Sequence, residues 1–150
     1  MIEDGIDLSE AKWHLRFLDL AMLVSTWSKD PSTCVGAVIV DSKRRVVGMG
    51  YNGFPRGVKD HRSRYNERET KYQFVVHAEL NAILNTLNQR ELHGADLYCT
   101  MFPCNECAKA IIQVGIVRVL APIKENDRWQ VLQGISHVMF DEAGVKVVPL

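Results

Sequence analysis

The sequence predicts an α/β fold, a three-layer α/β/α sandwich around one mixed sheet of about five strands. Two β-branched runs separated by a short polar turn predict an antiparallel hairpin in the first third of the chain. From about residue 74 onwards, helical segments alternate with short apolar segments, which is typical of parallel strands joined by crossover helices. The length of 150 residues suits a single domain, so we expect one domain over residues 1–150.

The first predicted element is an amphipathic helix from about Leu8 to Ser28. Asp7 and Glu10 resemble a capping pair at its start. We expect its apolar stripe to face the core rather than to form an aromatic binding strip. The stripe consists of side chains that recur every three or four residues, namely Trp13, Phe17, Leu20, Val24 and Trp27.

The predicted hairpin joins strands at Val35–Val40 and Val46–Tyr51, and an irregular segment follows it. This segment, Asn52–Glu69, is dense in glycine, proline, arginine and aspartate, and loops of this length are usually functional or disordered. Taken singly, its basic side chains are expected to be solvated. Together they are a plausible source of phosphate contacts, because arginine forks fit phosphate oxygens.

The remaining segments alternate between helix and strand. The predicted helices are Ala78–Gln89, Cys104–Val114 and about Asp127–Glu142, and the predicted strands are Ala95–Met101, Val117–Pro122 and Val145–Val148. Gly115 and Gly144 follow two of these helices and fit their C-terminal ends. In the first of the three helices, the spacing of Leu80, Ile83, Leu84 and Leu87 predicts one buried face.

Composition limits the kinds of protein that this chain can be. Hydrophobic residues make up 47% and charged residues 24%, and no apolar run approaches the length of a membrane span. The 18 basic and 18 acidic residues cancel, which argues against a long nucleic-acid partner but not against a small phosphorylated molecule. The N-terminus has no signal-peptide pattern and the cysteine content suits a reducing compartment, so we expect a cytoplasmic protein.

Two short motifs at the starts of predicted helices indicate a zinc site. His77-Ala78-Glu79 and Pro103-Cys104-Asn105-Glu106-Cys107 supply one imidazole and two thiols, and the two cysteines share one face of a helical turn. Three protein ligands leave the fourth tetrahedral position for water, as in catalytic rather than structural zinc sites. Glu79 is not needed as a ligand, and H-x-E followed by P-C-x-x-C is the signature of zinc-dependent nucleobase deaminases.

Two further cysteines remain outside these motifs. Cys34 and Cys99 lie in apolar, strand-like surroundings. We interpret both as small buried hydrophobic residues and not as metal ligands.

Over most of its length the chain resembles the deoxycytidylate (dCMP) deaminases of the zinc-dependent cytidine deaminase superfamily. The zinc motif is common to the superfamily, whereas GYNGFPRG followed by TKY is much more specific to the dCMP deaminases. The segments that carry the resemblance are Ser28–Ser32, Val35–Val40, Gly50–Gly57, Thr70–Tyr72, Val76–Ile83 and Phe102–Gln113.

The resemblance implies a cytidine-deaminase-like fold with one zinc ion per chain. His77, Cys104 and Cys107 would hold the metal, and Glu79 would be the catalytic proton donor and acceptor. It further implies substrate contacts by Asn52, Ala78 and Trp129, and a phosphate or effector loop containing Tyr51, Gly53 and Arg56.

The implied activity is hydrolysis of dCMP to dUMP, which supplies dTMP synthesis. Many members of the family are homohexamers, activated by dCTP and inhibited by dTTP, so we expect a homo-oligomer and a nucleotide effector bound with Mg²⁺. The segment Lys124–Trp129 replaces a tyrosine-containing loop of known relatives. Two alternatives therefore stay open: a deaminase for another nucleotide or base, and a non-catalytic zinc-stabilised module that binds nucleotide.

Overall fold

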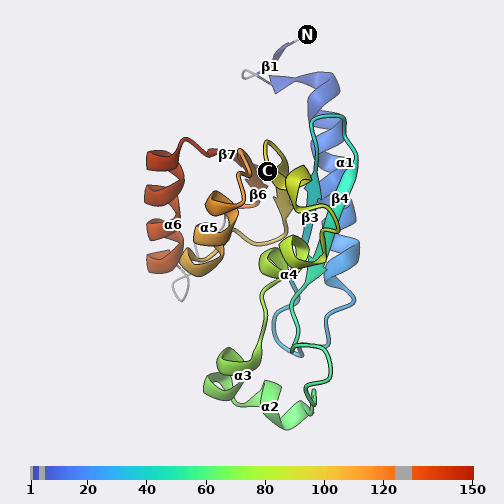
Figure 1. Cartoon of the computed structure of the whole chain (residues 1–150), viewed down its shortest axis with the longest axis vertical. Helices are drawn as coiled ribbons and strands as arrows, with labels where there is room; N and C mark the ends of the chain where they lie inside the picture. The colour runs from blue at the N-terminus through green and yellow to red at the C-terminus, as the bar shows by residue number, and fades with distance from the viewer. Residues whose placement is uncertain (1, 4–5, 124–129) are drawn as a thin grey trace.

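The computed structural model describes residues 2–3, 6–123 and 130–150 of the chain, and a five-stranded mixed sheet lies at its centre (Figure 1). Strand β3 pairs antiparallel with both β4 and β5, whereas β5, β6 and β7 run parallel. The strand order is β4-β3-β5-β6-β7, which confirms the predicted mixed sheet. The strands are β3 (Gly36–Val40), β4 (Val46–Tyr51), β5 (Asp96–Cys99), β6 (Arg118–Ala121) and β7 (Lys146–Pro149).

Helices cover both faces of this sheet because successive strand residues point to opposite sides. Helix α1 (Leu8–Ser25) packs on one face, where Phe17 and Ala21 meet Val38 and Tyr98. The opposite face carries α4 (Ala78–Asn85), α5 (Asn105–Gln113) and α6 (Gln130–Ala143). The smaller elements are β1 (Ile2–Glu3), paired with β2 (Ile6–Asp7), and a 3₁₀ turn, η1 (Gln89–Leu92).

Helix α4 buries only part of the face that the apolar spacing predicts. Its buried residues are Ala78, Glu79, Ala82 and Ile83, whereas the side chain of Leu84 is exposed. Leu87 lies beyond the end of the helix and is fully exposed, so the predicted stripe is right at Ile83 and wrong at Leu84 and Leu87.

The reason is the close approach of α4 to β4. A Cβ atom added at Gly50 would lie 2.3 Å from the Ala82 nitrogen and 2.5 Å from the Ala78 oxygen. Only small side chains fit between surfaces this close, and the helix therefore turns its alanines, not its leucines, towards the strand.

Two short helices occur in and after the segment that was predicted to be irregular. They are α2 (Arg62–Asn66) and α3 (Arg68–Phe74), and they lie beyond the sheet at the lower end of the view in Figure 1. The ring of Phe54 stacks on Tyr65 with 4.1 Å between ring centroids, which ties the start of the segment to α2. A backbone bridge between Gly53 and Val76 joins the beginning of this segment to the residues just before α4.

Two smaller expectations also need correction. Helix α1 ends at Ser25, three residues earlier than predicted, and Trp27 beyond it is exposed. Cys99 is buried as predicted, but Cys34 is exposed, because it precedes β3 in a turn where its sulfur lies 3.3 Å from the Asp30 carbonyl oxygen.

Within the described part of the chain, no helix combines the length and hydrophobicity that crossing a lipid bilayer requires.

Candidate metal centre

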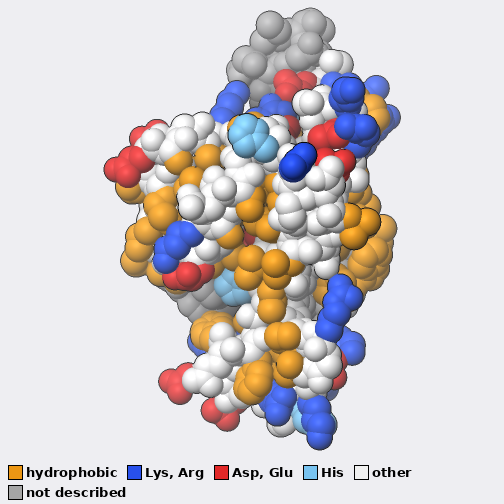
Figure 2. Space-filling view, in the orientation of Figure 1, with side chains coloured by type: hydrophobic (Ala, Val, Ile, Leu, Met, Phe, Trp, Pro, Cys, Tyr) orange, Lys and Arg blue, Asp and Glu red, His pale blue; other side chains and the backbone are white. Residues whose placement is uncertain are grey.

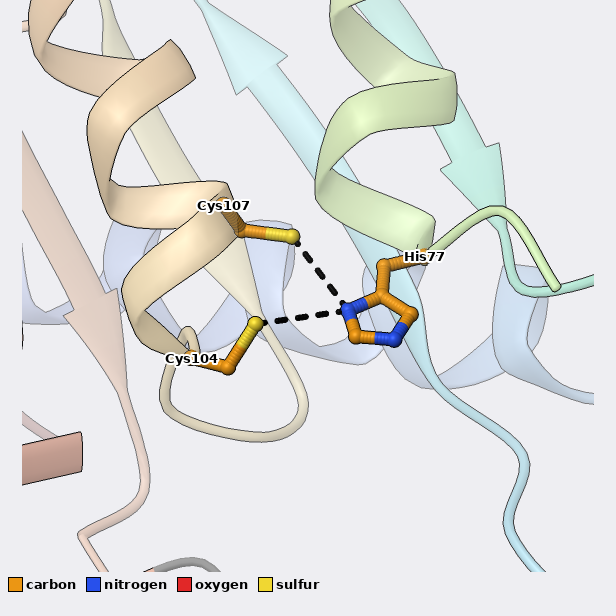
Figure 3. Close-up of side chains that lie close together, drawn as sticks. All are labelled: His77, Cys104 and Cys107. Atoms are coloured by element: carbon orange, nitrogen blue, oxygen red, sulfur yellow. Dashed lines mark hydrogen bonds between the residues drawn. The ribbon is translucent and has the colours of Figure 1, made fainter. Parts of the chain in front are cut away.

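The three expected zinc ligands meet where two helices begin. His77 is the N-cap of α4, and Cys104 is the N-cap of α5, with Cys107 one turn further on. Figure 3 shows all three side chains pointing towards one another from the two helices. The positive ends of both helix dipoles therefore face the cluster, which favours thiolate over thiol.

The distances between the ligand atoms fit a zinc ion. The Nδ1 atom of His77 lies 3.4 Å from the sulfur of Cys104 and 3.4 Å from that of Cys107. Tetrahedral zinc, with Zn–S near 2.3 Å and Zn–N near 2.0–2.1 Å, would place such atoms roughly 3.5 Å apart. No other group of three or more potential ligands occurs among the residues that the structure describes.

The electrostatics of the cluster favour ionisation of one thiol. A hydrogen bond from Cys107, assisted by His77, lowers the pKa of Cys104 well below the usual range for a thiol. A thiolate next to an imidazole suits a divalent metal, since metals bind the deprotonated sulfur.

Glu79 lies beside the ligands and not among them. Its side chain is buried, and the Cys99 thiol donates a hydrogen bond of 2.9 Å to its Oε1 atom. Burial raises the pKa of the Glu79 carboxyl, because the ion loses its hydration. A raised pKa makes a carboxyl easier to protonate, and a general acid and base must both gain and lose a proton.

One cavity connects the metal cluster with two of the expected substrate residues. Its walls include His77, Ala78, Glu79 and Cys104 together with Asn52. Gln133 of α6 also lines it and donates a hydrogen bond to the Phe102 carbonyl oxygen. The structure therefore brings Asn52 and Ala78 together with the metal cluster and Glu79 around a single space.

None of the three expected phosphate or effector residues lines this cavity. Tyr51 is exposed and packs edge-to-face on Trp27, with ring centroids 6.1 Å apart. Gly53 is held by its backbone bridge to Val76, and Arg56 donates a hydrogen bond to Asn85. Trp129, the remaining expected substrate residue, is outside the described residues.

Sequence reasoning gave no role to two charged residues that line the cavity. Asp30 and Lys71 form a buried ion pair with 3.1 Å between Nζ and Oδ2. Neither residue matches a general chemical motif. The sequence marks them only because Asp30 lies in SKDPS and Lys71 in TKY, two of the segments that resemble the dCMP deaminases.

An α/β/α fold that holds one imidazole, two thiols and a buried glutamate at two helix N-termini has the architecture of the zinc-dependent deaminases. Comparison with known families agrees with this class. Residues 11–122 match the family described as "Cytidine and deoxycytidylate deaminase zinc-binding region", and the chain belongs to that family.

Individual relatives are similar over most of the chain. An uncharacterized deaminase of Aliivibrio fischeri is 48% identical over 140 residues, which cover 91% of this chain and 92% of the relative. The deoxycytidylate deaminase of Pongo abelii is 44% identical and covers 89% of this chain and 77% of its own length. Among solved structures, the apo dCMP deaminase of cyanophage S-TIM5 has a TM-score of 0.74 at 25% identity, covering 97% of this chain and 100% of that one.

Proposed function

We propose that this chain is a hydrolase that converts dCMP into dUMP and ammonia, and so provides dUMP for dTMP synthesis. The observation that carries the proposal is the buried Glu79 carboxyl, which lines the same cavity as His77 and Cys104, two of the three residues of the metal cluster. The deoxycytidylate deaminase of Pongo abelii, with 44% identity over 140 residues, supports dCMP as the substrate.

The proposed roles follow from the chemistry of each side chain. Zinc held by His77, Cys104 and Cys107 would lower the pKa of a coordinated water towards neutrality. Glu79 would accept a proton from the attacking water, deliver it to N3 of the pyrimidine ring and later protonate the departing ammonia. Asn52 and Ala78 would contact the bound nucleotide from the cavity walls, and Trp129 is proposed as a further contact on the basis of resemblance alone.

The decisive experiment compares dCMP with deoxycytidine at fixed salt concentration. Phosphate contacts lie far from the reacting carbon, so their binding energy can be used to position the ring. Two charge-assisted hydrogen bonds predict that kcat/KM for the nucleoside is lower by about 10²–10⁴-fold. Equal kcat/KM values, or a preference for CMP or a purine nucleotide in the same ammonia-release assay, would contradict dCMP as the substrate.

We further propose that the protein works as a homo-oligomer. Hydrophobic side chains gather along the side of the molecule where α1 and β4 lie (Figure 2). The exposed hydrophobic residues of these two elements include Met22 and Leu23 of α1 and Met49 and Tyr51 of the edge strand β4. Trp27, just beyond α1, is also exposed and packs on Tyr51. Light scattering after size-exclusion chromatography tests this directly, since a monomeric mass at micromolar concentration would contradict it.

Regulation and location are proposed from resemblance and thiol chemistry. The family resemblance supports activation by dCTP and inhibition by dTTP, each with Mg²⁺, and a hexamer as the assembly. Initial rates at low dCMP with and without each nucleotide test the regulation, and unchanged rates would contradict it. A site built on two free thiols requires a reducing compartment, which supports action in the cytoplasm.

A further inference from the structure

A short loop, residues 28–35, surrounds Asn52, which lines the cavity together with Glu79. The Ser28 hydroxyl donates a hydrogen bond to the Asn52 carbonyl oxygen, and the Asn52 Nδ2 group donates one of 2.8 Å to the Thr33 carbonyl oxygen. The Val35 backbone N–H donates to Asn52 Oδ1, also at 2.8 Å. These contacts fix which end of the carboxamide is the donor and which the acceptor.

Asp30 holds both the loop and the carboxamide. Its Oδ1 atom accepts hydrogen bonds from the Ser32 N–H at 2.9 Å and the Thr33 N–H at 3.2 Å, which shape the turn that presents the Thr33 carbonyl. Its Oδ2 atom accepts the second N–H of Asn52 at 3.4 Å and pairs with Lys71 at 3.1 Å. The side chain of Asp30 is only 1% exposed and that of Lys71 is 8% exposed.

This pairing keeps the Asp30 carboxylate charged inside the protein. Burial alone would raise its pKa, but the hydrogen bonds from the turn and from Lys71 outweigh burial and lower the pKa. Buried ion pairs are weak contributors to net stability, and replacement by apolar groups is often neutral. Asp30 of this pair contacts Asn52. We therefore attribute the position of the pair to the orientation of the Asn52 side chain and not to the stability of the fold.

The hydrogen-bonding capacity left to Asn52 defines what it can recognise. Both of its Nδ2 hydrogens are engaged by Thr33 and Asp30, and one Oδ1 lone pair is engaged by Val35. One acceptor position on Oδ1 remains. A group that donates a hydrogen bond is the complement of that position, and the 3′-hydroxyl is the one hydroxyl on the sugar of dCMP.

We propose that Asp30, neutralised by Lys71, is a positioning residue that locks the Asn52 carboxamide as an acceptor and so sets selectivity for a substrate with a free 3′-hydroxyl. The inference rests on the proposed deamination of dCMP. Asparagine cannot replace Asp30 in this role. Its single oxygen can serve either the turn amides or Asn52, and its amide would place donors opposite the donors of Asn52 and Lys71.

The test compares kcat/KM for dCMP with that for 2′,3′-dideoxycytidine monophosphate, which lacks only the 3′-hydroxyl. One hydrogen bond to a buried acceptor predicts that the wild-type protein prefers dCMP on the order of 10-fold. In Asp30→Asn the preference should fall to within about twofold of unity, because kcat/KM for dCMP falls while that for the dideoxynucleotide changes little. A purely structural role would lower both values by the same factor and leave their ratio unchanged.

Two further variants make the result unambiguous. Asp30→Asn combined with Lys71→Met removes both charges, so no unpaired ion is left buried, and it should show the same loss of preference. Asp41→Asn is the matched control, because Asp41 also accepts backbone hydrogen bonds in a turn but makes none to Asn52. It should keep the wild-type preference.

The outcomes separate this inference from the proposed function. A wild-type protein that contains zinc but does not deaminate dCMP would reject the function itself. A wild-type protein that deaminates dCMP and does not discriminate against the dideoxynucleotide would overturn the inference alone. Full preference retained in zinc-loaded Asp30→Asn would overturn it as well.

Discussion

Glu79 shows how a single side chain acquires its chemistry from burial. It follows His77 by two residues, but its side chain is only 4% exposed and accepts a hydrogen bond from the Cys99 thiol. Glu79 therefore lies beside the metal ligands and is not one of them. The same carboxyl on the surface would stay ionised at neutral pH and would be a poor proton donor. The local environment, more than the residue type, makes Glu79 a candidate proton shuttle.

Replacing Glu79 with glutamine should separate proton transfer from metal binding. Glu79→Gln is nearly isosteric, so zinc content should stay at about one ion per chain. The rate of dCMP deamination should fall by about 10²–10⁴-fold, and by more if the group acts in several proton transfers. Ammonia release and elemental analysis measure the two properties. Glu106→Gln, which changes an exposed glutamate in the first turn of α5, is the control and should keep full activity.

Removal of one thiol should remove the metal. Cys104→Ala leaves two ligands and should lose zinc together with all measurable deamination. Cys34→Ala removes an exposed thiol outside the cluster and should retain both. Elemental analysis of the two proteins after identical dialysis gives the answer, and an active, zinc-free wild-type protein would contradict the assigned centre.

At the scale of elements, the contact between α4 and β4 determines where the metal ligands lie. The glycines of β4 allow α4 to approach until backbone meets backbone, and the N-terminal end of α4 carries both His77 and Glu79. A change in that contact should therefore move the ligands as well as destabilise the fold.

Gly50→Ala tests this coupling. The added methyl group would clash with the backbone at Ala78 and Ala82, and overpacking of this kind typically costs about 1–3 kcal/mol in the free energy of unfolding. We expect lower zinc affinity in addition, because α4 must shift. Gly134→Ala in α6 is the control, because no atom lies within 4 Å of the added carbon. Alanine is more favourable than glycine in a helix by roughly 0.5–1 kcal/mol, so this variant should be as stable as the wild type or more stable. Denaturant titration and competitive chelation measure the two effects, and unchanged zinc affinity in Gly50→Ala would contradict the coupling.

For the molecule as a whole, polar side chains buried between α1 and the sheet make stability depend on pH. His14 of α1 is buried, and its Nδ1 lies 2.7 Å from the Tyr98 hydroxyl of β5. Burial lowers the pKa of His14, and the nearby Arg118 lowers it further. The folded protein therefore binds fewer protons at this site than the unfolded chain does.

The sign of the effect follows from that difference. Above the unfolded value of about 6.5 both states are neutral at this site, and stability is at its maximum with respect to His14. As the pH falls below 6.5 towards the folded value, the unfolded chain takes up the proton first, and the free energy of unfolding declines. The decline should be at most about 1.4 kcal/mol per pH unit. Urea titrations at pH 7.5, 6.5 and 5.5 should show a steeper loss for wild type than for His14→Gln, and parallel losses would contradict the assignment.

The amino-acid sequence by itself determined the class of fold and the metal ligands. Alternating periodicities along the chain were enough to predict the hairpin, the parallel strands and the helices between them, because each is a local property of a short segment. The metal ligands were predictable for the same reason, since Cys104 and Cys107 lie within one turn of a helix and His77 has a distinctive neighbour in Glu79.

Only the tertiary structure decided which surfaces are buried and which distant residues meet. Leu84 belongs to the apolar helical spacing of α4, yet it is exposed, because the glycines of β4 accept only the alanine face of the helix. Asp30, Asn52 and Lys71 come from a loop, a strand end and a short helix, and nothing local marks them as partners. Burial and pairing depend on the surface that the rest of the chain presents, and that surface exists only once the sheet and its helices have assembled.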